Sequence, residues 1–93
     1  MIENEDSIVR GALLTKFFSQ FQRGCAITYI GGSTSRYVTI NQKYEIKRPP
    51  WSEKDYITWI IEVENDRGYI SVLNNTNFEE TSSDSFEKWL KEN

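Results

Sequence analysis

The chain has 93 residues, of which 38% are hydrophobic, 14% aromatic and 27% charged, and these figures predict one folded domain over residues 1–93. It contains no histidine and a single cysteine, Cys25, which excludes an internal disulfide, a structural zinc site and the Ser-His and Cys-His catalytic arrangements. We therefore expect a protein that is not an enzyme and that holds no metal and no cofactor.

The formal net charge of −3 hides an uneven distribution of charge along the chain. Residues 10–54 hold eight basic and two acidic residues, a net charge of +6, whereas residues 55–93 hold nine acidic and three basic residues, a net charge of −6. Such asymmetry is typical of a surface that binds nucleic acid or an acidic protein. It also arises when the two halves lie side by side in the fold and neutralise each other.

The sequence contains neither a recognisable targeting signal nor a membrane-spanning run. The residues after Met1 are acidic, unlike the basic start of a secretory signal, and the longest apolar runs fall far short of the ~20 residues that span a bilayer. A lone cysteine suits a reducing compartment. We therefore expect a cytoplasmic protein that does not contact a membrane.

The first predicted element is a helix that follows a disordered start over residues 1–6. Asp6 or Ser7 is placed to cap it, because either side chain accepts a hydrogen bond from the first free N–H groups. Gly24 suits the left-handed residue that closes a helix. An apolar stripe at helical spacing runs between these ends through Val9, Leu13, Phe17 and Phe21.

A pair of strands is predicted next. Residues 25–30 have the β-branched and aromatic character of a strand, and residues 31–35 are rich in glycine and serine, as expected for a hairpin loop. From residue 37 to residue 47 apolar and polar side chains alternate, which is typical of a strand with one buried face. Pro49 and Pro50 are predicted to end this strand, because neither proline donates a hydrogen bond to a ladder.

A second hairpin is predicted over residues 56–73, with its turn at residues 65–68. Alternation along the two strands sets the side chains expected to point inward, namely Ile57, Trp59, Ile61, Val63, Ile70 and Val72. Tyr69 and Leu73 are expected to point outward. Tyr44 of the preceding strand and Trp59 are expected to face the helix.

The chain closes with a polar loop over residues 74–77 and a short helix. Asp84 and Glu87 have the spacing of a capping box at its start. An apolar edge formed by Phe86, Trp89 and Leu90 must dock, because so short a helix is not stable alone. The element order predicts an α+β fold: an N-terminal helix packed on a four-stranded antiparallel meander, with a short C-terminal helix.

The basic and aromatic segment 36–56 is the predicted binding surface. Alternation places Tyr37, Lys43, Lys47 and Tyr56 on one sheet face, with Tyr69 and Ile60 near them. The loop that follows Lys47 is stiff enough to present Trp51. Cations neutralise phosphates, and aromatic faces stack on bases. The candidate partner-binding residues are Arg36, Tyr37, Lys43, Lys47, Arg48, Trp51, Tyr56 and Tyr69.

Three other arrangements of this surface remain open from the sequence. Trp51 can fold back onto the sheet edge, and the final helix can cover the face. The face can also be a homodimer seam, because a part-apolar patch is formed by Tyr37, Ile60, Tyr69 and Leu73.

Two functions fit this sequence. The first is a small non-enzymatic regulator that binds another protein, as inhibitors, antitoxins and phage host modulators do, and it is favoured by the small size and the many Tyr and Trp residues. The alternative is binding of RNA or single-stranded DNA through the basic, aromatic segment 36–56. We favour the protein partner.

Overall fold

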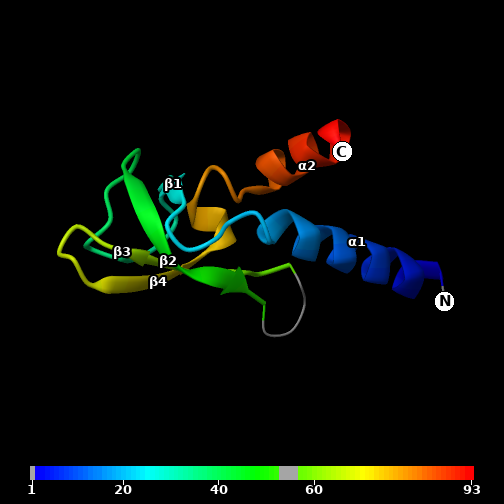
Figure 1. The fold of residues 1–93 in the computed structure, drawn as a ribbon, viewed down its shortest axis with the longest axis horizontal. Coiled ribbons are helices and arrows are strands. Elements are labelled where there is room, and N and C mark those ends of the chain that lie inside the picture. The colour runs from blue at the N-terminus through cyan, green and yellow to red at the C-terminus, as the bar shows by residue number, and fades with distance from the viewer. Residues whose placement is uncertain (1, 53–56) are drawn as a thin grey trace.

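The computed structural model describes residues 2–52 and 57–93, with side chains from residue 8 onward. The elements follow in the order α1 (Ile2–Phe18), β1 (Ala26–Thr28), β2 (Lys43–Trp51), β3 (Ile60–Glu64), β4 (Ile70–Asn74), the 3-10 turn η1 (Asn75–Asn77) and α2 (Ser83–Glu92) (Figure 1). The predicted α+β fold is confirmed: a helix precedes a four-stranded antiparallel sheet, and a short helix ends the chain.

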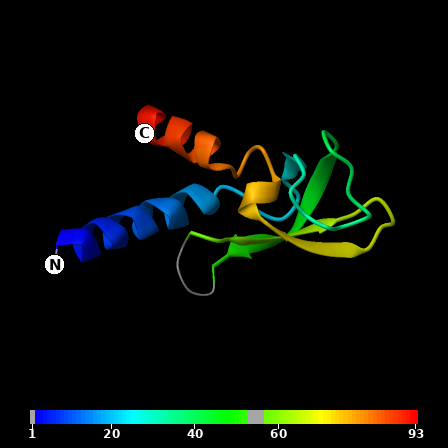
Figure 2. The ribbon, with the colours of Figure 1, turned by 180° about the vertical axis from the view of Figure 1, so that it is seen from behind.

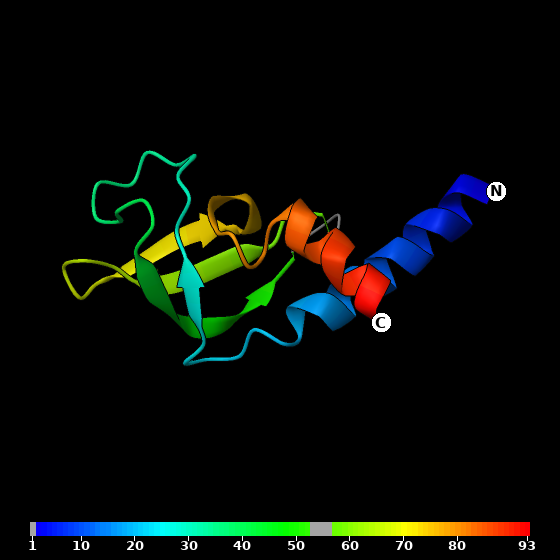
Figure 3. The same ribbon diagram turned by 90° about the horizontal axis from the view of Figure 1, so that it is seen from above.

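The sheet has the strand order β1-β2-β3-β4, and β2 joins its two halves. Residues 43–45 pair with β1, and residues 46–51 pair with β3. Register shifts on both sides of Arg48 bend β2 between these partners, and the curvature is visible in Figure 3. After η1 the chain returns along the far side of β1, where Tyr29 forms a bridge with Phe78. The sheet therefore curls partway toward closure.

Side chains are buried in two groups. The sheet cluster consists of Ile27, Tyr29, Tyr44, Ile46, Ile61, Val63, Leu73 and Phe78. The helix cluster consists of Leu14, Phe17, Phe18, Trp59 and Phe86. The Trp59 ring stacks on Phe18 with 4.4 Å between ring centroids, and Phe17 meets Phe86 edge to face at 5.3 Å. Trp59, which directly precedes β3, therefore connects the end of the sheet to both helices.

The two helices lie together at one end of the sheet, and α1 projects beyond it (Figure 2). α1 begins at Ile2, so the predicted start at Asp6 or Ser7 is wrong, and residues 2–6 are helical where the sequence suggested disorder. The predicted cap of α2 at Asp84 is also wrong. Ser82 caps this helix, because its side chain accepts a hydrogen bond from the Ser85 N–H.

The second strand lies later in the chain than predicted. Residues 30–42 form a loop, and β2 continues through Pro49 and Pro50 to Trp51, so the predicted strand from residue 37 and its proline stop are wrong. The prolines are tolerated because they lie within a register shift. Among the described residues, no strand pairs with the other side of this part of β2, so no ladder hydrogen bond is lost there.

The face that β4 buries is the opposite of the predicted one. Leu73 belongs to the sheet cluster, whereas Ile70 and Val72 are 50% and 63% exposed. The turn sets this parity, because the Asn65 N–H donates to the Tyr69 carbonyl and so places Leu73 opposite the buried Ile61. The predicted burial of Trp59, Ile61 and Val63 is confirmed, whereas Ile57, predicted to be buried, is 66% exposed.

This parity predicts a sharp contrast between neighbouring substitutions. Leu73→Ala removes a buried side chain, and we expect it to lower the free energy of unfolding by about 2–5 kcal/mol. Val72→Ala alters an exposed side chain, and we expect a change within about 0.5 kcal/mol. Equilibrium urea unfolding followed by tryptophan fluorescence measures both. Costs in the reverse order would show that the strand register is shifted by one residue.

Candidate functional site

The outward-pointing residues of β2, β3 and β4 form a single surface, which we call the outer face. It consists of Glu45, Lys47, Arg48, Glu62, Glu64, Ile70 and Val72. Cross-strand pairing sets its layout, because Glu62 lies opposite both Arg48 and Val72, and Glu64 lies opposite Ile70. The face therefore carries two cations and Glu45 on β2, an acidic row on β3 and an apolar row on β4.

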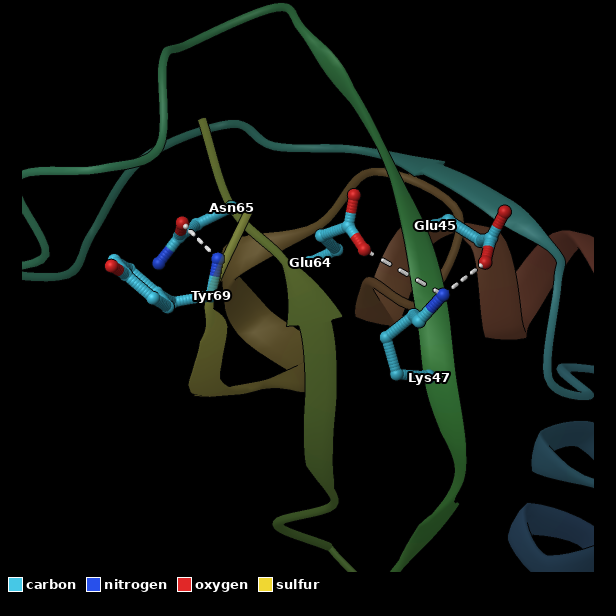
Figure 4. Close-up of polar contacts among 5 residues, drawn as sticks. All are labelled: Glu45, Lys47, Glu64, Asn65 and Tyr69. Carbon is cyan, nitrogen blue, oxygen red and sulfur yellow. Dashed lines mark hydrogen bonds and ion pairs between the residues drawn. The ribbon is translucent and has the colours of Figure 1, made fainter. Parts of the chain in front are cut away.

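Lys47 is held between two carboxylates (Figure 4). Its Nζ lies 2.7 Å from Glu45 Oε2 and 3.7 Å from Glu64 Oε1. The hydrogen bond from Lys47, together with its positive charge, lowers the pKa of Glu45, and the same hydrogen bond raises the pKa of Lys47. This cation from the basic half of the chain is therefore neutralised in part by an acid of the acidic half.

Arg48 makes the corresponding contact one residue later. Its Nη1 lies 3.8 Å from Glu62 Oε2, and its guanidinium carbon lies 4.0 Å from the centroid of the Trp51 ring. Trp51 is half-buried at the end of β2, where it pairs with Ile60. Trp51 is therefore part of the strand rather than of a loop beyond it, and its side chain is not fully presented to solvent.

Of the remaining candidate residues, Lys43 points to the same side of β2 as Lys47, whereas Arg36, Tyr37 and Tyr69 lie in loops or turns. Arg36 and Tyr37 lie in the loop over residues 30–42, and the Arg67 guanidinium carbon lies 5.1 Å from the centroid of the Tyr37 ring. Lys43 is exposed at the start of β2, and Tyr69 is exposed at the end of the β3–β4 turn. Tyr56 lies outside the described residues. The prediction that Tyr37, Lys43 and Lys47 share one sheet face is therefore wrong for Tyr37.

A hydrogen-bond network, which we call the loop clamp, ties this loop to the β3–β4 turn. The Tyr44 hydroxyl donates to Asp66 Oδ1 over 2.8 Å and accepts from the Thr39 N–H over 2.6 Å. The Thr39 hydroxyl donates to Asp66 Oδ2 over 2.9 Å, and the Asp66 N–H donates to the Tyr37 carbonyl over 2.8 Å. Tyr44, expected to face the helix, instead lies in the sheet cluster and anchors the loop that carries Tyr37.

Sequence reasoning missed the apolar row. Ile70 and Val72 are exposed on the same side of β4, and the inward parity assigned to them concealed this. An open, uncharged trough of about 570 Å³ lies beside β4. It is lined by Gly32, Ser33, Thr34, Ser35, Thr58, Ile60, Val72, Leu73, Asn74 and Asn77. The sequence contained one signal for this row, the length of the β3–β4 turn. Turn length sets which side chains of β4 are exposed, whereas hydrophobicity does not.

The Lys47 contacts predict the titration of Glu45. Because the folded-state pKa of Glu45 is lowered, its contact with Lys47 stabilises the fold above the ordinary pKa of 4.5 and is lost as the pH falls through the folded-state value. We expect the Glu45 carboxyl, followed by NMR, to titrate below 4.5 in the wild type and to move up toward 4.5 in Lys47→Gln. Lys43→Gln is the matched control. A Glu45 midpoint that Lys47→Gln leaves unchanged would contradict the contact.

The loop clamp predicts a second pair of substitutions. Tyr44→Phe removes the hydroxyl that joins Asp66 to the Thr39 N–H, and we expect a loss of about 0.5–1.5 kcal/mol in the free energy of unfolding. The Thr39 amide should also exchange with solvent faster. Tyr37→Phe serves as the control and should leave that exchange rate unchanged. Equal Thr39 protection in Tyr44→Phe and the wild type would show that the clamp does not hold the loop.

Comparisons with known proteins do not assign a function to the outer face. No protein-family model, curated protein or solved structure matches the chain. Within residues 2–52 and 57–93, no helix is both long and apolar enough to cross a bilayer, and no cluster of three or more Cys, Asp or Glu side chains is arranged to hold a metal ion. The function is therefore argued from the outer face itself.

Proposed function

We propose that this protein is a small non-enzymatic regulator that acts in the cytoplasm by binding another protein through the outer face, in the manner of an inhibitor, an antitoxin or a phage host modulator. The observation that carries this proposal is the exposed apolar row of β4 beside the ion pairs of Lys47 with Glu64 and of Arg48 with Glu62. Protein interfaces combine an apolar centre with a polar surround in this way. The unpaired Cys25 is consistent with a reducing compartment.

The ion pairs favour a protein partner over RNA or single-stranded DNA. A phosphate that approaches Lys47 or Arg48 must compete with the carboxylates of Glu45, Glu64 and Glu62 that already contact these cations. Nucleic-acid binding gains affinity when free cationic side chains neutralise phosphates and so cause the release of the counterions condensed on the nucleic acid. A protein partner needs no such release, and an Arg–Trp pair such as Arg48 and Trp51 is of the kind that dominates binding energy at protein interfaces.

Affinity capture with paired variants tests the proposal. The wild-type protein should retain a stoichiometric protein from the source cell, and Arg48→Ala should weaken the affinity of that purified partner about tenfold or more. Lys16→Ala, a substitution of an exposed cation on α1, should bind the partner like the wild type.

Two outcomes would contradict this proposal. One is the absence of any stoichiometric protein that Arg48→Ala releases. The other is co-purification of nucleic acid, seen as a high 260/280 nm absorbance ratio that falls after a salt wash. The second outcome would support the alternative function, in which exposed cations such as Arg36 and Lys43 contact phosphates.

A further inference from the structure

The edges of the sheet are not protected equally. The far side of β1 is covered by the segment after η1, because the Ile30 N–H donates to the Asn77 carbonyl over 2.8 Å and the Glu79 N–H donates to the Thr28 carbonyl over 2.9 Å. The part of β2 beyond β1 carries two prolines and a register shift. Both devices prevent a further strand from pairing with an edge.

β4 carries none of these devices. Its five residues, Ile70–Asn74, include no charged residue and no proline, and they pair with β3 without a register shift. β4 is the last strand in the sheet order, so one side of it faces away from the sheet. A flat, uncharged edge strand with exposed apolar side chains is the arrangement that recruits another strand.

The ladder fixes which main-chain groups face outward from β4. The Asn65 N–H donates to the Tyr69 carbonyl, and the Asn75 N–H donates to the Trp59 carbonyl, so these two pairs are hydrogen-bonded pairs of the β3–β4 ladder. Because such pairs alternate along an antiparallel ladder, Ser71 and Leu73 also bond to β3. It follows that the N–H and C=O groups of Ile70 and Val72 point away from β3.

We propose that β4 pairs in an antiparallel manner with β4 of a second copy of this chain, so that the two sheets continue into each other across a two-fold axis. With Ile70 of one copy opposite Val72 of the other, the outward N–H and C=O groups satisfy each other. The same register brings the exposed Ile70 and Val72 side chains of the two copies together.

The charges near the edge suit a second copy. A strand with no charge meets no like charge when it pairs with itself, and the neighbouring acids Glu62 and Glu64 are already contacted by Arg48 and Lys47. The trough beside β4 is lined by uncharged residues, so it also presents no like charge to a second copy.

The size of the contact sets the expected affinity. A five-residue strand is roughly 17 Å long, so pairing along it buries less than the ~800 Å² per partner of a standard interface. We therefore expect a weak dimer that forms as the concentration rises. Edge pairing leaves the charged residues of the outer face open and sets the apolar rows of two copies side by side. This inference goes beyond the proposed function and does not depend on it.

Sedimentation velocity with matched lysine variants tests the proposal. The wild type should pass from monomer to dimer between about 10 μM and about 1 mM, the range expected of a small interface. Val72→Lys should remain monomeric, and the introduced lysine lies opposite Glu62, which accommodates it in the folded monomer. Val9→Lys, a substitution of an equally exposed valine on α1, should dimerise like the wild type.

Hydrogen exchange gives a readout that needs no variant. The Ile70 and Val72 amides should gain protection as the concentration of the wild type rises, whereas the Ser71 and Leu73 amides should be protected at every concentration. Three results would overturn the proposal. The wild type could stay monomeric, or its dimer could be disrupted by Val9→Lys and not by Val72→Lys. The exchange rates of the Ile70 and Val72 amides could also be independent of concentration. A monomer that still captures a partner through Arg48 would leave the proposed function standing.

Discussion

The bend of β2 around Arg48 is the constraint on which the rest of this fold depends. Its first residues pair with β1 and its later ones with β3, so one strand belongs to both halves of the sheet. The register shifts that produce the bend accommodate the two prolines and bring Arg48 opposite Glu62. The bend also gives the sheet its curl, which lets the segment after η1 reach β1, and within the described residues β4 remains the last strand of the sheet.

The sequence predicted those parts of the fold whose pattern has a single interpretation. Around β3, alternation identified Trp59, Ile61 and Val63 as buried, because the charged residues Glu62 and Glu64 occupy the other parity. In β4, Ile70 and Val72 share one parity and Leu73 holds the other, so hydrophobicity could not decide between them. The hydrogen bond between the Asn65 N–H and the Tyr69 carbonyl sets the strand register, and the register determines which side chains of β4 are buried. Local turn geometry therefore outweighed the side-chain pattern.

The candidate surface was less predictable than the fold, because its layout depends on register. The charge blocks along the chain raised the alternative that the basic and acidic halves neutralise each other, and the contacts of Lys47 and Arg48 bear this out for those two cations. Which acid meets which cation follows from pairing across β2 and β3, which composition does not encode. Exposed ion pairs of this kind add little stability, so their main effect is to set which charges a ligand meets on approach.

The return of the chain to β1 has a consequence for how the protein folds. The Thr28 N–H and hydroxyl both donate to the Glu80 carboxylate, across 52 residues of sequence, and the Tyr29–Phe78 bridge lies beside this contact. Contacts between such distant segments slow folding, because the entropy of closing a long loop is lost before any contact forms. During synthesis on the ribosome, the second edge of β1 can therefore be covered only after residues 78–80 have been made. The contacts at the second edge of β1 are therefore the last of the sheet to become available.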